Sequence, residues 1–104
     1  MEINKNILNE NKVIVSPQEN IDFANSNELK EELISIKEEG YNQIEIDFGE
    51  VNSIDSSGLG KLLLFHKRLK EKDGELSIKN IQSDYIKNMF DMIKLNKVIK
   101  IDEK

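Results

Sequence analysis

The chain has 104 residues, 38% of them apolar and 34% charged, a balance typical of one folded domain rather than of a disordered tail. Its formal net charge of -5 argues against a nucleic-acid partner, because phosphate neutralisation needs a basic surface, and the absence of cysteine excludes disulfides, thiol catalysis and thiolate metal sites. No apolar run reaches the ~18 residues of a membrane span and MEINKNILNENK lacks the apolar core of a signal peptide, so we expect residues 1–104 to form a single cytoplasmic domain.

The N-terminal part of the chain predicts a β-hairpin followed by a helix. Two short apolar segments, 3–8 and 13–15, are predicted to be the hairpin strands. The helix has apolar residues at helical spacing, namely Leu29, Leu33, Ile34 and Ile36. We expect Asn25 to cap its start while Glu28 reaches back to the backbone N–H of the cap. Gly40 is expected to end the helix in a left-handed conformation.

The remaining chain alternates strand and helix patterns. Residues 43–48 alternate apolar and polar side chains, which predicts a strand with one buried face, and the same alternation recurs at 75–79. Helical spacing extends over 57–72, Ser83 is expected to cap a third helix, and 98–101 is predicted to be the last strand. The order is strand, strand, helix, strand, helix, strand, helix, strand. It predicts an α/β domain with a mixed sheet, parallel later strands and helices packed mainly on one face.

The stretch IDSSGLGKLLLF, residues 54–65, joins the strand at 43–48 to the second helix. Hydroxyl groups at a helix start lie beside unsatisfied backbone N–H groups and the positive end of the helix dipole. One hydroxyl suffices for a cap, so the other is free to face outward, where a phosphate would be favoured. Gly58 and Gly60 each cost a helix roughly 0.5 to 1 kcal/mol relative to alanine, and close approach by another molecule would explain them.

Enzyme and metal-site hypotheses find little support in the sequence. The serines lack the G-x-S-x-G pattern, and the glycines lack the upstream glycine of a nucleotide-binding loop. His66 lies on the apolar stripe, roughly 13 Å or more along the helix from Ser57, and is predicted to be a packing residue rather than a base. Asp22, Asp47 and Asp55 could gather at one sheet edge, but three acids without histidine are a weak metal signal. We therefore predict no catalytic residue, metal or cofactor.

Two motifs carry a family resemblance. Asp55-Ser56-Ser57-Gly58-Leu59-Gly60 opens a helix after an apolar strand, and residues 89–97, MFDMIKLNK, precede the last strand. The sequence resembles the STAS-domain anti-sigma factor antagonists, whose signature is D-S-S-G-L-G followed by L-F-D-x-x-G-L-x-K. The resemblance implies a STAS fold and a regulatory binding protein rather than an enzyme. Members commonly continue into a final helix, which we expect to be absent here.

The resemblance also implies a phosphorylation switch. In the family, the unphosphorylated protein binds an anti-sigma factor that is also an ATP-dependent serine kinase, which frees a sigma factor for transcription. The kinase phosphorylates the first serine of the motif, here Ser56, affinity falls, and a serine phosphatase resets the switch. Ser57 is then left as the expected helix cap. The residues expected to contact the partner are Asp22, Asp55, Ser57, Gly58, Leu59 and Gly60.

Two departures from the family pattern affect these expectations. The family's G-E-L-D or G-D-L-D segment is Glu19-Asn20-Ile21-Asp22 here, so the partner-facing loop is altered although Asp22 is kept. Ile93 stands where a glycine is often found. An alternative from another functional class is a structural STAS module, acting as a scaffold in a stress-sensing complex or as a cytoplasmic subunit of a lipid transporter. Such a module would bind like domains without any dependence on a kinase.

Overall fold

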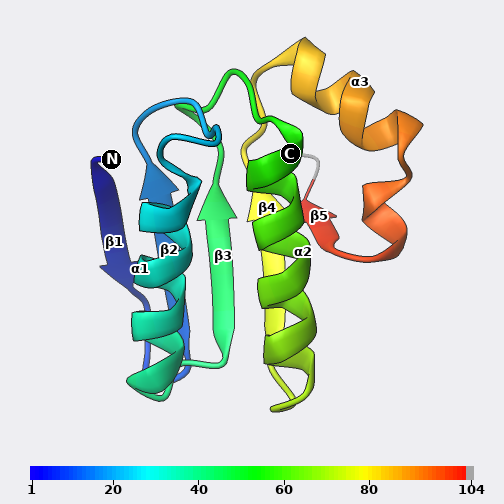
Figure 1. Ribbon diagram of the computed structural model, residues 1–104. Helices are drawn as coiled ribbons and strands as arrows, with labels where there is room; N and C mark the ends of the chain where they lie inside the picture. The colour runs from blue at the N-terminus through cyan, green and yellow to red at the C-terminus, as the bar shows by residue number, and fades with distance from the viewer. Residues whose placement is uncertain (103–104) are drawn as a thin grey trace.

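The computed structural model describes residues 1–102, which form one five-stranded sheet with three α-helices (Figure 1). The elements in chain order are β1 (Ile3–Ile7), β2 (Lys12–Pro17), α1 (Ser26–Glu38), β3 (Gln43–Asp47), α2 (Ser56–Lys70), β4 (Glu75–Lys79), α3 (Asp84–Met92), the short 3-10 helix η1 (Leu95–Lys97) and β5 (Lys100–Asp102). The predicted order of strands and helices is confirmed, and η1 is added to it.

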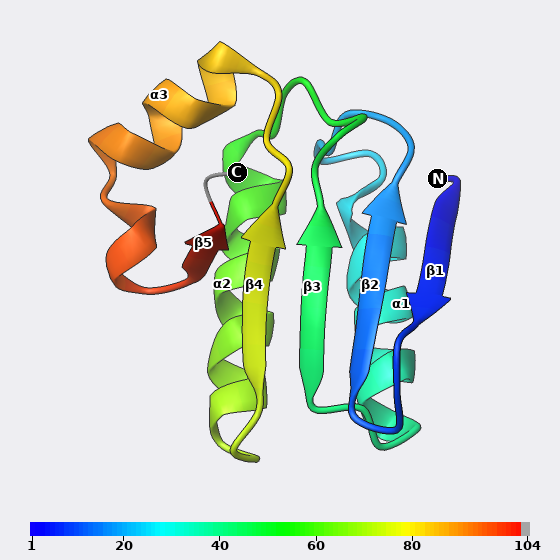
Figure 2. The same cartoon turned by 180° about the vertical axis from the view of Figure 1, so that it is seen from behind.

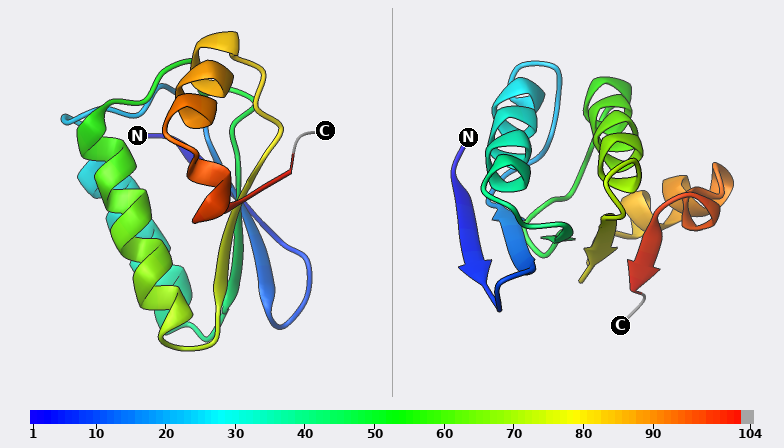
Figure 3. Two further views of the ribbon diagram at one scale, coloured as in Figure 1. Left: turned by 90° about the vertical axis from the view of Figure 1, so that its right-hand side faces the viewer. Right: turned by 90° about the horizontal axis from the view of Figure 1, so that it is seen from below.

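The sheet is mixed, and its helices lie mainly on one side. The strand order is β1-β2-β3-β4-β5, with β1 antiparallel to β2 and every later neighbour parallel. Helices α1 and α2 lie side by side on one face, and the opposite face is uncovered (Figure 2). Helix α3 lies near the β5 edge instead (Figure 3). Within residues 1–102, no helix has the length and apolar character needed to cross a membrane.

The core lies between the central strands and the first two helices. The buried side chains of β2, β3 and β4 are Val13, Val15, Ile44, Ile46, Leu76 and Ile78. They pack against the apolar stripes of α1 and α2, which are Leu29, Leu33, Ile36, Leu62, Phe65 and Leu69. Apart from Ile14, the alternate positions of these strands are polar and lie on the opposite face of the sheet, where Lys12 and Glu45 form an ion pair at 3.6 Å. Burying each large apolar side chain stabilises the folded state by roughly 1.5 to 3 kcal/mol. The apolar faces that the sequence patterns define on the strands and helices therefore pack against each other.

Helix α1 begins directly after Asn25, as predicted, but the expected capping box is wrong. The Asn25 side chain makes no bond to the helix. Its Oδ1 accepts from the N–H of Asp22 at 2.9 Å, and its amide donates to the carbonyl oxygen of Asn20 at 2.7 Å. Glu28 pairs instead with the terminal amine of Met1. Asn25 is buried, and it satisfies the backbone of the preceding loop rather than the helix start.

The ends of α1 and α2 use different chemistry. Gly40 follows α1 with φ of 105°, which confirms the predicted glycine termination. After α2 the left-handed residue is Asp73, with φ of 60°, and not the adjacent Gly74. Gly74 is required for space, because a Cβ there would lie 2.5 Å from the carbonyl oxygen of Asn42.

The turn between α3 and η1 corrects one detail of the family comparison. Ile93 has φ of -90°, which suits any side chain. The following residue, Lys94, has φ of 55° and ψ of 44°, the conformation that glycine adopts most readily. The glycine position of the family pattern is therefore occupied by Lys94, and the expectation that placed it at Ile93 is wrong.

Candidate functional site

Two loops meet where the hexapeptide 55–60 begins, beyond the carboxyl ends of β2 and β3 (Figure 1). Ile21 in the first loop and Ile54 in the second form an isolated parallel bridge. The N–H of Ile21 donates to the carbonyl oxygen of Ser53, and the N–H of Asp55 donates to the carbonyl oxygen of Ile21, both at 3.1 Å. Although they are separated by helix α1 and strand β3, the loops form one hydrogen-bonded unit.

Asp55, not Ser57, is the N-cap of α2. Its backbone is extended, with φ of -96° and ψ of -179°, and Oδ1 accepts from the N–H of Gly58 at 2.9 Å. Oδ2 of the same carboxylate accepts from the N–H of Phe23 at 2.9 Å. The helix begins at Ser56, so Ser57 already has helical geometry and cannot occupy the capping position. The expectation that Ser57 caps the helix is therefore wrong.

Ser56 is the first residue of α2, and its side chain is exposed. No hydrogen bond within residues 1–102 engages its hydroxyl, because the carboxylate of Asp55 already serves the cap. An exposed hydroxyl at this position lies at the positive end of the helix dipole, where an added phosphate is favoured. Its geometry thus fits the phosphorylation site expected from the family resemblance.

The two glycines of the hexapeptide occupy different environments. Gly58 is buried, and a Cβ there would lie 2.6 Å from Cγ2 of Ile21 and 3.0 Å from Cγ1 of Ile54. Packing within the fold therefore explains the small size of Gly58, without an approaching partner. Gly60 is exposed, and a Cβ there would meet no atom within 4 Å, so its surface is open. Leu59, between them, is half-buried.

Comparison with known proteins assigns the chain to a family. Residues 1–104 match the model of the STAS domain. A curated relative, the anti-sigma-B factor antagonist of Bacillus subtilis, is 31% identical over 96 residues, which span 92% of this chain and 86% of the relative. The chain belongs to the STAS family of anti-sigma factor antagonists. The anti-sigma-B factor antagonist of Staphylococcus epidermidis is 30% identical over 76 residues, spanning 73% of this chain and 69% of that relative.

Solved structures share the STAS fold at lower sequence identity. A Thermotoga maritima protein superposes with a TM-score of 0.89 at 21% identity, covering 98% of this chain and 86% of that one. SpoIIAA in its unphosphorylated form superposes with a TM-score of 0.75 at 15% identity, covering 99% and 89%. These likenesses confirm the predicted α/β STAS architecture.

Asp22 organises the altered loop of this STAS domain. Its Oδ1 accepts from the N–H groups of Ala24 at 2.9 Å and Asn25 at 3.1 Å, and its carbonyl oxygen accepts from the N–H of Ser26 at 2.8 Å. The residue is exposed, so its carboxylate is open to solvent while it holds the turn that leads into α1. Asp22 therefore has a structural role in the loop that Phe23 joins to Asp55 of the hexapeptide, and its part in partner binding stays a prediction.

Sequence reasoning missed Phe23, which lies beside the hexapeptide with 76% of its surface exposed. The sequence places Phe23 in the stretch that leads into α1 and gives no indication of its exposure. In the structure, Phe23 lies in the turn that the Asp22 carboxylate holds through the N–H groups of Ala24 and Asn25. No local signal reports that, because the bond that orients Phe23 comes from Asp55, 32 residues away in the chain.

The three candidate metal ligands do not come together. Oδ1 of Asp47 accepts from the N–H of Gly49 and from the side-chain amide of Asn80. Asp22 and Asp55 are engaged in their own loop bonds. No group of three or more metal-binding side chains is present among residues 1–102.

His66 lies further along α2 and is partly buried, which fits a packing role. Its Nδ1 is buried and has no hydrogen-bond partner within residues 1–102. Burial lowers the pKa of His66, the charge of Lys70 lowers it further, and Glu75 opposes the shift. His66 therefore favours the neutral form, and no hydrogen bond within residues 1–102 joins it to either serine of the hexapeptide.

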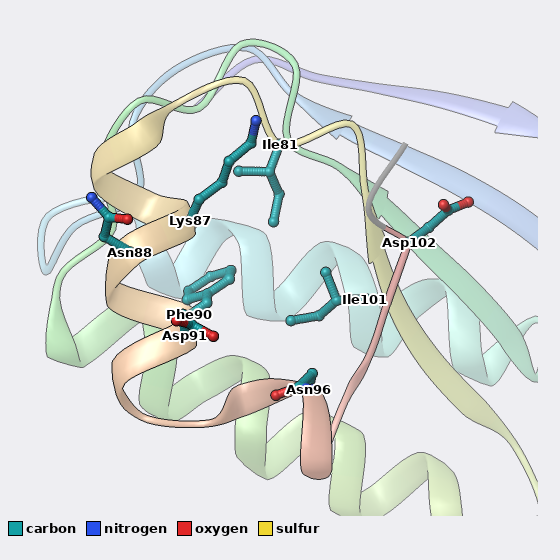
Figure 4. Close-up of a pocket in the computed structure, with 8 residues that line it drawn as sticks. All are labelled: Ile81, Lys87, Asn88, Phe90, Asp91, Asn96, Ile101 and Asp102. Carbon is teal, nitrogen blue, oxygen red and sulfur yellow. The ribbon is translucent and has the colours of Figure 1, made fainter.

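A pocket of about 350 Å³ lies between α3 and β5 (Figure 4). Its lining residues are Ile81, Lys87, Asn88, Phe90, Asp91, Asn96, Ile101 and Asp102. None of the predicted site residues lines it. The candidate functional site of this STAS domain is therefore the exposed surface formed by the two joined loops and the start of α2.

Proposed function

We propose that this STAS domain is a cytoplasmic anti-sigma factor antagonist controlled by phosphorylation at Ser56. In its unphosphorylated form it binds an anti-sigma factor with serine kinase activity, which frees a sigma factor for transcription. The observation that carries the proposal is the position of Ser56, an exposed and unengaged hydroxyl at the first residue of α2, within the family hexapeptide.

Phosphorylation at this position adds charge without removing the helix cap. The kinase transfers the γ-phosphoryl group of ATP to Oγ of Ser56, releasing ADP, and the hydroxyl proton passes to a base of the kinase. The product carries about 1.5 to 2 added negative charges beside the carboxylate of Asp55. Because Asp55 caps the helix through its own oxygen, the fold does not depend on the hydroxyl that is modified.

The modified serine opposes binding for two physical reasons. An interface that covers Ser56 must strip water from a phosphate dianion, which is costly unless cationic groups replace that water. The dianion also repels the phosphate groups of the nucleotide that the kinase holds opposite Ser56. A single phosphate at this surface is thus sufficient to end the complex, and a serine phosphatase restores binding by removing it.

The direct test is phosphorylation by the anti-sigma factor kinase of the same organism, purified and supplied with ATP. We expect intact-mass spectrometry to detect one phosphate on the wild type and on Ser57→Ala, and none on Ser56→Ala. Peptide mapping should place the phosphate on Ser56. A phosphate on Ser57 with Ser56 unmodified would overturn the assignment.

Binding measurements test the electrostatic part of the proposal. Ser56→Asp is expected to weaken the complex with the anti-sigma factor, and Ser56→Ala to preserve it. Equal affinities for the two variants would contradict a charge-based switch. A structural STAS module would behave differently, binding like domains regardless of ATP and of the residue at position 56, which analytical ultracentrifugation would detect.

A further inference from the structure

Phe23 combines high exposure with a fixed backbone. Its side chain is 76% exposed, although burying a large aromatic side chain is normally favourable. Its N–H is bonded to Asp55, and the turn on either side of it is closed by bonds to Asp22 and Asn25. The ring is therefore presented to solvent from an ordered loop.

The loop is also held at its beginning. Oδ1 of Asn20 accepts from the N–H of Asn52 at 2.7 Å and from the N–H of Ser53 at 3.2 Å, which joins it to the loop before α2. With the bond between Phe23 and Asp55, these contacts fasten the two loops at both ends of the segment 20–23. An anchor held in its binding position loses little conformational entropy when a partner covers it.

The chemistry around Phe23 indicates what kind of surface would cover it. Large aromatic side chains that fill pockets often dominate the energy of protein interfaces. Three exposed acidic residues lie at this loop: Glu19 directly before the segment 20–23, Asp22 within it, and Asp55, which accepts from the N–H of Phe23. The complementary surface is an apolar pocket bordered by cationic side chains, because charge complementarity aligns partners and speeds their encounter.

We propose that Phe23 is the apolar anchor of the partner-binding surface, and that Asp55 is the positioning residue that presents it beside Ser56. The inference rests on the proposed function and assigns to the anti-sigma factor kinase an apolar pocket with a cationic rim. One carboxylate thus aligns two features of the surface, since Oδ1 sets the start of the helix that carries Ser56 and Oδ2 sets the loop that carries Phe23.

The first experiment measures binding and phosphorylation of Phe23→Ala with the purified anti-sigma factor kinase. We expect the dissociation constant to rise about ten- to thirtyfold, as for an aromatic hot spot. The KM for phosphorylation should rise similarly while kcat stays unchanged, because Ser56 itself is untouched. Phe23→Leu should recover part of the affinity.

The matched control is Ile7→Ala. Ile7 is also exposed, at 60%, but it pairs with Val13 at the opposite end of β2 from the site. We expect its binding and KM to equal those of the wild type. If wild type and Phe23→Ala are phosphorylated with equal KM and bind equally, the anchor assignment is overturned. A wild type that is not phosphorylated at all overturns the proposed function, and the anchor assignment with it.

The second experiment tests positioning without a partner. Asp55→Asn retains a good N-cap, but an NH2 group, which donates, replaces one of the two carboxylate oxygens. Because Gly58 and Phe23 donate to different oxygens of Asp55, the variant that keeps the cap to Gly58 loses the acceptor for Phe23. Amide hydrogen exchange at Phe23 should become faster while exchange at Gly58 stays slow. Unchanged exchange at Phe23 would overturn the positioning role, whatever the outcome with the kinase.

Discussion

The N–H of Phe23 donates to Oδ2 of Asp55 at 2.9 Å, although the two residues lie 32 positions apart. The other oxygen of this carboxylate caps α2. The family motif predicts that Asp55 contacts a partner. Within the fold, its carboxylate connects the loop that carries Phe23 to the start of α2. A substitution at Asp55 therefore affects the helix start and the neighbouring loop together.

Removing the Asp55 side chain is expected to destabilise the domain more than removing that of Ser57. Asp55→Ala loses the cap and should lower the free energy of unfolding by about 1 to 2 kcal/mol. Ser57→Ala leaves the cap intact and should change it by no more than about 0.5 kcal/mol. Urea denaturation followed by circular dichroism measures both. A larger loss for Ser57→Ala would restore Ser57 as the cap.

Alanine substitutions at the two glycines should have opposite effects. Gly58→Ala places a Cβ against Ile21 and Ile54, and we expect a net loss of about 1 to 2 kcal/mol, since overpacking outweighs the gain in helix propensity. Gly60→Ala meets no atom within 4 Å and should stabilise the domain by about 0.5 to 1 kcal/mol. The same denaturation assay applies. Destabilisation by Gly60→Ala would contradict the open environment of that residue.

The turn after α3 offers a second matched pair. Lys94→Gly should raise the free energy of unfolding by about 0.5 to 1 kcal/mol, because relief of the left-handed conformation exceeds the added entropy of the unfolded chain. Ile93→Gly has no such strain to relieve and should lower it by about 0.5 to 1 kcal/mol. Thermal and urea unfolding of the two variants would distinguish them. Equal effects would argue against Lys94 as the family glycine position.

His66 should make stability depend on pH. Burial lowers its pKa from 6.5, so in the range below 6.5 the unfolded chain binds a proton more readily than the folded domain. The free energy of unfolding therefore contains a contribution that is present above pH 6.5 and is lost as pH falls through and below that value. His66→Gln should show a smaller decrease between about pH 7.5 and about pH 5.5 than the wild type. Parallel curves for the two proteins would exclude His66 as the cause.

Local patterns predicted most of the architecture. Period-2 alternation at 43–48 and 75–79 predicted β3 and β4, and helical spacing of apolar residues predicted α1 and α2. Both patterns arise because one face of each element is buried. The hexapeptide 55–60 supplied the family and the candidate phosphorylation site. These features depend on residues close together in the chain.

The details that differ from prediction depend on residues far apart. Asn25 and Glu28 suited a capping box, yet both are engaged by other parts of the chain. Ser57 was the expected cap, but Asp55 precedes it in an extended conformation stabilised by the adjacent loop. Sequence spacing lists possible donors and acceptors without indicating which ones meet in space.

The first turn of α2 shows which features depend on local sequence and which depend on tertiary contacts. The amino-acid sequence determined that a strand is followed by a helix at 55–60, with hydroxyl groups at the helix start, because hydrophobic periodicity and motif chemistry are local. The tertiary structure decided that Asp55 caps the helix, that Gly58 is packed against Ile21, and that Phe23 is exposed beside Ser56. Each of these outcomes requires the two loops to meet, and only the packing of the parallel strands brings them together.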